Sequence, residues 1–178
     1  MNTMFLHVRT LCLIFASLLG LLIGPSSLFA NLKEDIDSLQ SMLAANQLVE
    51  ARPLMDSLRG EVEPQVVANL DFFYALSYVF EYYESNNVAV LDTAKAKFEA
   101  FLSSYSTHDL AGLARYNLAD VNAISGDFKE ALTLYISLYR NPVKGVDRKD
   151  VLKKVVLIYA AEEEWEACLL YTSDAADE

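Results

Sequence analysis

Few side chains in this sequence could carry out catalysis. His108 is the only histidine between residues 31 and 167, and that segment has no cysteine, so a histidine-rich metal site and a cysteine–histidine nucleophile are excluded there. His108 and Asp109 could supply two members of a serine–histidine–aspartate arrangement. The pair stands where a helix is expected to begin, however, and a carboxylate there favourably meets the helix dipole. We therefore expect a capping or solvent-exposed role for both residues.

A second group of candidate side chains consists of four carboxylates within about one helical turn. They could hold a cation, but acidic side chains packed this closely more often form a solvated helix face, and we expect the solvated face here. These carboxylates belong to Glu162, Glu163, Glu164 and Glu166. Residues 31–167 also lack a phosphate-binding loop and a dinucleotide fingerprint. The sequence therefore predicts no catalytic residue, no metal site and no cofactor.

Tyrosines provide the best candidate for a binding surface. Tyr74, Tyr78 and Tyr82 are spaced at i, i+4 and i+8, which places them on one side of a helix. A tyrosine offers an apolar ring together with a hydroxyl group, a combination suited to gripping peptides. The alternative is that the aromatic side chains of this helix pack against neighbouring helices.

Helices must position these side chains, because apolar residues recur at helical spacing along residues 31–167 and no convincing period-two alternation appears. Glycine, proline and asparagine interrupt the pattern. Pro53 must lie in the first turn of its helix or kink it. The expected helices cover about residues 32–45, 48–58, 65–84, 91–105, 110–121, 128–139 and 151–159, with Asp147 as a candidate cap for the last.

The clearest helix pair surrounds Gly126, which supplies a permissive backbone for a tight turn. We expect Asp127 to cap the second helix through its side chain, with Glu130 completing a capping box. A small residue at Ala131 would let the two helix axes approach closely. The second helix has a strong amphipathic pattern at i, i+3, i+4, i+7, i+10 and i+11, formed by Phe128, Ala131, Leu132, Tyr135, Leu138 and Tyr139.

This pair, with ARYNLA at 114–119 and SGDFKEAL at 125–132, resembles a tetratricopeptide repeat. The match is best over residues 109–142 and is suggestive over 32–59, 64–105 and 147–167. Ala119 stands where the family commonly has glycine, and Asn122 stands where it commonly has an aromatic residue. The spacing from Leu118 to Val155, like that from Phe128 to Trp165, is 37 residues, against a usual period of about 34. The resemblance assigns helix packing within and between repeats to Leu118, Ala119, Gly126, Phe128, Ala131 and Tyr135.

The resemblance implies an all-α fold, a right-handed superhelical solenoid of antiparallel helix pairs with about three and a half repeats. It also implies partner binding, because peptides in this family are often held by asparagine side chains. Asn117 and Asn122 are the candidates for that role in the third pair.

Both ends of the chain are expected to differ from its central domain. Residues 1–30, with an uncharged apolar run at 11–24, look like a secretory signal peptide cleaved after Ala30, and an uncleaved anchor is the alternative. Residues 168–178 resemble a translated sequencing adapter, and a genuine acidic tail is the alternative. Residues 31–167 would then be a repeat domain truncated near Ala167.

The charge of the chain argues against nucleic-acid partners. It carries 14 basic and 25 acidic side chains, giving a net charge of -11, and anionic membrane surfaces are disfavoured for the same reason. Its two cysteines, Cys12 and Cys168, lie in the end segments. No disulfide framework is therefore expected within residues 31–167.

Together these features predict an exported scaffold that binds protein or peptide partners in the periplasm or cell envelope of a bacterium, without catalysis of its own. FEAFLSSY at 98–105 and ARYNLA at 114–119 also resemble the repeat regions of bacterial envelope proteins. Two alternatives stay open. The chain could be the substrate-recruiting region of a longer envelope enzyme, or it could be a structural subunit of an envelope assembly.

Overall fold

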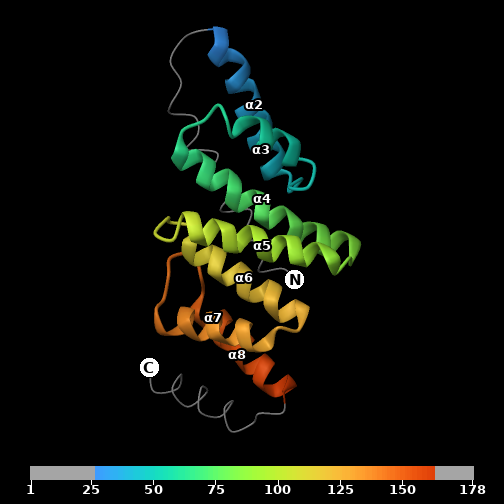
Figure 1. Cartoon of the computed structure of the whole chain (residues 1–178), viewed down its shortest axis with the longest axis vertical. Helices are drawn as coiled ribbons and strands as arrows, with labels where there is room; N and C mark the ends of the chain where they lie inside the picture. The colour runs from blue at the N-terminus through green and yellow to red at the C-terminus, as the bar shows by residue number, and fades with distance from the viewer. Residues whose placement is uncertain (1–26, 163–178) are drawn as a thin grey trace. The chain divides into compact units, whose positions relative to one another are not determined.

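The computed structural model describes residues 27–162, and every regular element in that range is an α-helix (Figure 1). The all-α expectation is therefore confirmed. The chain divides into two compact units, with the boundary between Val90 and Leu91. The helices are α2 (Ser27–Ala44), α3 (Arg52–Leu58), α4 (Pro64–Ser85), α5 (Ala89–Ser104), α6 (Ala111–Ser125), α7 (Phe128–Arg140) and α8 (Arg148–Ala161).

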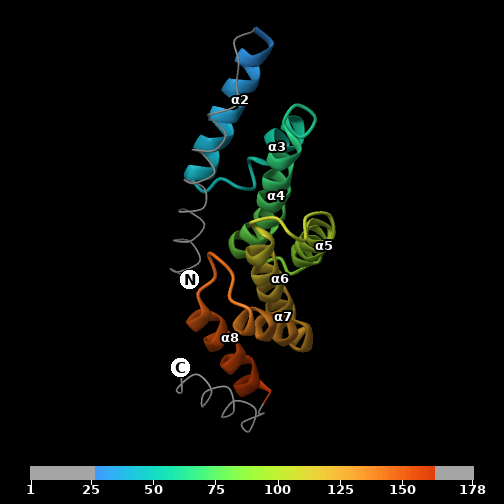
Figure 2. The same ribbon diagram turned by 90° about the vertical axis from the view of Figure 1, so that its left-hand side faces the viewer.

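In the first unit α2 packs against α3, and α3 packs against α4 (Figure 2). The chain reverses after α2 at Asn46, which adopts a left-handed conformation with φ 63° that asparagine tolerates better than most residues. α3 is shorter than expected because turns occupy the residues before Arg52. Pro53 lies in its first turn, which is one of the two predicted alternatives, and there the missing amide leaves no helix bond unmade.

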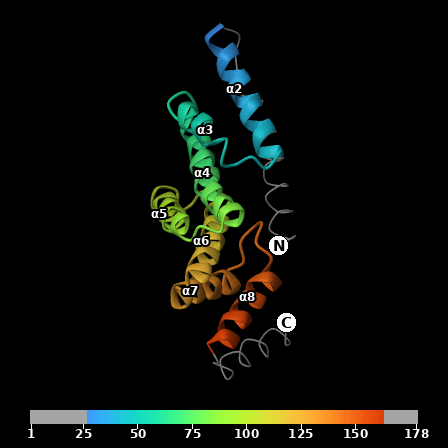
Figure 3. The same cartoon turned by 90° about the vertical axis from the view of Figure 1, so that its right-hand side faces the viewer.

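In the second unit α6 packs against α7, and α7 packs against α8 (Figure 3). Gly126 ends α6 with φ 85°, and the Asp127 amide donates to the Asn122 carbonyl at 2.8 Å. The Gly126 amide also donates to the Ala123 carbonyl at 3.3 Å, which completes a Schellman motif. The turn predicted at Gly126 is thus confirmed.

One of the two predicted caps is wrong. Asp127 precedes α7 but makes no side-chain capping bond, and its carboxylate instead accepts from Lys95 Nζ of α5 at 2.7 Å. An ion pair with a distant residue therefore replaces the expected capping interaction. Asp147 does cap α8, because its carboxylate accepts from the Lys149 amide at 2.9 Å.

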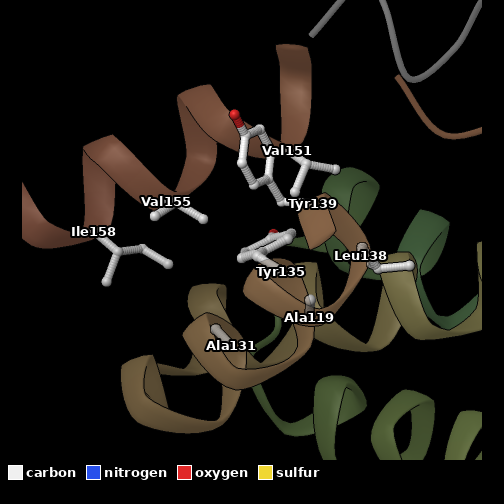
Figure 4. Close-up of a cluster of buried hydrophobic side chains, with 8 residues drawn as sticks. All are labelled: Ala119, Ala131, Tyr135, Leu138, Tyr139, Val151, Val155 and Ile158. Atoms are coloured by element: carbon white, nitrogen blue, oxygen red, sulfur yellow. The ribbon is translucent and has the colours of Figure 1, made fainter. Parts of the chain in front are cut away.

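A cluster of buried apolar side chains joins α6, α7 and α8 in the second unit (Figure 4). Ala119 and Ala131 are fully buried in it and add little bulk, so that α6 and α7 can pack closely. Leu118 is buried as well, while Phe128 is half-buried at the start of α7. The cluster consists of Ala119, Ala131, Tyr135, Leu138, Tyr139, Val151, Val155 and Ile158.

Burial in the second unit recurs at a spacing of 37 residues. Three buried positions of α5, namely Ala94, Phe98 and Phe101, correspond at this spacing to Ala131, Tyr135 and Leu138 of α7. Likewise, Ala114, Leu118 and Val121 of α6 correspond to Val151, Val155 and Ile158 of α8. The same faces of alternate helices are therefore buried in this unit. The superhelix and the count of repeats remain predictions.

Candidate functional site

Two of the three candidate tyrosines lie beneath arginines, one at the start of α3 and one directly after its end. The guanidinium carbon of Arg52 is 3.7 Å from the centroid of the Tyr78 ring, and that of Arg59 is 4.9 Å from the Tyr74 ring. Both rings are half-buried and meet edge to face, with centroids 5.8 Å apart. These contacts are cation–π interactions, which fix α3 on α4. The packing alternative thus accounts for part of the surface of Tyr74 and Tyr78.

Polar bonds surround these rings. Arg52 donates to Ser77 Oγ at 2.6 Å and to Glu81 at 2.7 Å, and Arg59 pairs with Asp71 at 2.7 Å. The Tyr74 hydroxyl donates to Asp56 Oδ2 at 3.1 Å. Burial, together with the nearby Tyr78 and Asp56, raises the pKa of Tyr74 to about 12.

The third tyrosine lies at the end of α4. Tyr82 is half-buried, and its ring centroid is 5.3 Å from that of Tyr83, whose side chain is 43% exposed. This pair presents an aromatic surface to solvent at the C-terminal end of the helix. Of the predicted stripe, Tyr82 is therefore the residue that best suits contact with a partner.

The two candidate asparagines are buried. Asn117 is 7% exposed, and its amide donates to the Leu113 carbonyl of its own helix at 2.8 Å. Asn122 is 3% exposed, and its Oδ1 has no hydrogen-bond partner among the described residues. Neither side chain is therefore accessible to a partner that approaches from solvent.

Next to them is a buried polar network that the sequence reasoning missed. Asp120 of α6 is 5% exposed and accepts from the Tyr135 hydroxyl of α7 and from Lys154 Nζ of α8, the latter at 2.5 Å. Tyr116 of α6 donates to Asp150 of α8. Since Tyr116 and Asp120 are four residues apart, as are Asp150 and Lys154, matched i, i+4 polar pairs were a signal available in the sequence.

Burial shifts the pKa of two groups in this network, the Asp120 carboxyl and the Tyr135 hydroxyl. Burial raises the pKa of Asp120 above its ordinary value, while the attraction of Lys154 and the Tyr135 hydroxyl bond oppose that rise. Burial and the neighbouring Asp120 carboxylate also raise the pKa of Tyr135. The network therefore ties three helices together around the buried Asp120 carboxylate and Tyr135 hydroxyl.

A groove of about 780 Å³ lies along the other side of α7, bordered by the end of α8. Its apolar side chains, Phe128, Leu132, Ile136 and Tyr159, are half-buried. Lys129 and Arg140 flank them, and both are exposed. Sequence reasoning assigned the apolar residues of α7 to packing and did not foresee this groove.

The candidate catalytic and metal-binding side chains lie partly within residues 27–162. His108 Nδ1 accepts from the Leu110 amide at 3.2 Å just before α6, and no side-chain bond caps the start of that helix. No group of three or more His, Cys, Asp or Glu side chains in the described residues is placed to hold a metal ion. Of the predicted acidic cluster, Glu162 is exposed, and Glu163, Glu164 and Glu166 lie outside those residues.

The end segments are mostly outside the described part of the chain as well. Of the predicted signal peptide only the last four residues fall within it, as the start of α2, and residues 168–178 fall outside it. None of the helices described has the length and hydropathy needed to cross a membrane.

Comparison of the chain with known protein families, with curated proteins and with solved structures finds no match. The site must therefore be interpreted from its own geometry. What that geometry offers is contact surface: an aromatic pair at the end of α4 and an apolar groove with basic flanks on α7.

Proposed function

We propose that this protein is an exported helical-repeat scaffold of the tetratricopeptide type that binds protein partners in a bacterial envelope. The observation that carries the proposal is the 37-residue recurrence of buried positions between α5 and α7 and between α6 and α8. Stacked repeats of helix pairs bury one face of each helix and leave another face as an extended surface for partners.

Two kinds of observation support binding as the role of that surface. The surface features found in the second unit and on α4 are apolar or aromatic with polar edges, which is the composition of protein interfaces. In addition, some acidic and basic groups of the described residues pair with one another between helices, as Arg52 does with Glu81 and Lys154 with Asp120. Such pairs serve packing.

Export rests on the sequence alone, through the apolar run at residues 11–24 and the small residues that follow it. Among the alternatives raised by the sequence, a recruiting region of a longer enzyme would use the same surfaces. The binding proposal is common to both.

The test is capture of partners by the full chain from a periplasmic extract, followed by titration of each captured protein in purified form. We expect saturable binding that Tyr82→Ala weakens, because Tyr82 lies at the exposed aromatic end of α4. Tyr74→Ala is the matched control, since its ring lies under Arg59 and its loss should loosen α3 while affecting partners less. If no purified protein binds saturably, the scaffold proposal is wrong.

A further inference from the structure

The groove on α7 has a shape that suits a helix. Phe128, Leu132 and Ile136 are spaced at i, i+4 and i+8, so they form a line of apolar side chains along three turns of α7, and Tyr159 of α8 borders it. α7 has 13 residues, which gives it a length of about 20 Å. The apolar line from Phe128 to Ile136 covers about 12 Å of this length, which matches about two turns of the apolar face of an amphipathic helix.

The flanks of the groove are basic. Lys129 lies at the first turn of α7 and Arg140 at its last, and among the described residues Glu162 is the only acidic one in the lining. Thr133, Ser137 and Asn141 supply neutral polar groups between them. A helix lying in the groove would therefore meet a positive charge near each of its ends.

The surroundings are basic too, in contrast to the rest of the chain. Residues 128–162, which include Glu162 of the groove, hold seven of the 14 basic side chains and four of the 25 acidic ones. In a protein of net charge -11, this local excess of positive charge favours an acidic partner and directs it to the α7–α8 end of the second unit.

We propose that the α7 groove binds an acidic amphipathic helix of a partner protein, with its apolar face on Phe128, Leu132 and Ile136 and its carboxylates near Lys129 and Arg140. This proposal rests on the scaffold function above and names a partner class and a site for it. A nucleic acid would be less suited, because its bases and phosphates offer no continuous apolar face to the floor of the groove.

The test uses two synthetic helical peptides with leucines at i, i+3, i+4 and i+7, one with glutamates and the other with lysines at the remaining positions. Binding to the full chain is measured by fluorescence anisotropy. We expect the glutamate peptide to bind more tightly than the lysine peptide. The double variant Lys129→Glu, Arg140→Glu should weaken the glutamate peptide by about tenfold or more, since both charged contacts reverse sign.

A matched control separates the groove from general charge attraction. Lys144→Glu, Lys149→Glu changes the net charge by the same amount in the same region, but neither residue lines the groove and both are exposed. It should weaken the glutamate peptide by less than about threefold. Ile136→Ser should weaken both peptides, because it removes part of the apolar floor.

Several outcomes would overturn the proposal. Equal binding of the two peptides, or equal effects of the two double variants, would show that the groove does not select an acidic helix. Loss of self-association in Lys129→Glu, Arg140→Glu would instead assign the groove to a second copy. A change in the emission of Trp165, the only tryptophan, on Ile136→Ser would assign it to the chain's own C-terminal residues.

Failure of the groove proposal can also be distinguished from failure of the scaffold proposal. If partners captured from the extract bind Lys129→Glu, Arg140→Glu as well as the parent chain, only the groove assignment is wrong. If no partner binds the parent chain saturably, the scaffold function itself is wrong.

Discussion

Polar clusters join helices in both units, but burial of their acidic groups differs sharply. In the first unit, Arg52 and Arg59 lie over tyrosine rings of α4 and pair with Glu81 and Asp71, whose side chains are 31% and 25% exposed. In the second unit, the Asp120 side chain is only 6% exposed where Lys154 meets it. Removing a partner leaves a hydrated carboxylate in the first unit and a buried charge in the second.

This difference indicates that the polar clusters of the two units contribute differently to stability. The carboxylates of the α3–α4 cluster can exchange a bond for water, so their loss should have a modest cost. The Asp120 carboxylate is shielded from water, so its bonds fix how α6, α7 and α8 pack. Variants in matched pairs can test this contrast, and hydrogen exchange reads each unit separately.

The largest difference in the free energy of unfolding is expected between substitutions of Tyr135 and Tyr74. Tyr135→Ala should lower the free energy of unfolding of the second unit by about 4 kcal/mol, because it leaves a cavity beside Ala131 and removes a bond to Asp120. Tyr74→Ala should cost the first unit about 1 kcal/mol, since its ring is half-buried under Arg59. Similar losses for the two variants, measured by native-state hydrogen exchange, would contradict the contrast.

A smaller difference is expected for the basic partners. Lys154→Met should destabilise the second unit by about 2 kcal/mol, less than for a fully buried pair because the lysine side chain is 30% exposed. Arg52→Met should cost the first unit less than about 1 kcal/mol, since Glu81 can be hydrated. If Arg52→Met proves the more costly in denaturant unfolding, its own buried bonds to Ser77 and the Tyr78 ring outweigh the burial of the carboxylate.

The pH dependence of the second unit should be opposite in sign to that of an ordinary ion pair. Burial raises the pKa of Asp120 above 3.8 in the folded chain, so the folded state binds the proton more tightly than the unfolded state. The resulting stabilisation is complete below pH 3.8 and is lost as the pH rises through the raised pKa. Asp120→Asn lacks this titration, and Asp150, Lys154, Tyr116 and Tyr135 face the same site.

We therefore expect the stability of the parent chain relative to Asp120→Asn to fall as the pH increases across that window. Denaturant unfolding of both proteins at a series of pH values measures the difference. A relative stability that rises with pH would mean that Lys154 dominates and that the pKa of Asp120 is lowered.

The smallest effect concerns the titration of single tyrosines. Tyr74 should ionise in the folded chain with a pKa of about 12, and Asp56→Asn should lower that value because it removes a negative charge and an acceptor. Tyr135 should resist ionisation further, being more buried and in contact with Asp120. NMR of labelled tyrosine rings measures both. An unchanged Tyr74 pKa in Asp56→Asn would show that burial alone raises it.

Local sequence patterns predicted the helices well. Helix formation depends on apolar spacing and on residues that stop helices, and both are visible within one or two turns. Pro53 in the first turn of α3, Gly126 at the end of α6 and Asp147 as the cap of α8 were predicted for this reason and are found. The same reasoning failed at Asp127, because Lys95 lies 32 residues away and competes for its carboxylate.

The candidate sites were less predictable, since exposure is decided by which helices cover a residue. The spacing of Tyr74, Tyr78 and Tyr82 is a property of the sequence, but only packing placed the first two under Arg59 and Arg52. In the same way, Asn117 and Asn122 looked available and are buried.

The sequence by itself determined that the chain is helical and where its turns fall, and it showed the spacing of 37 residues from Leu118 to Val155, because these follow from the order of apolar and turn-forming residues. The tertiary structure alone decided that Asp120 is buried against Tyr135 and Lys154 and that Phe128, Leu132 and Ile136 line a basic-flanked groove. Both depend on contacts between helices far apart in the sequence, and no local pattern specifies which polar or apolar face another helix will cover.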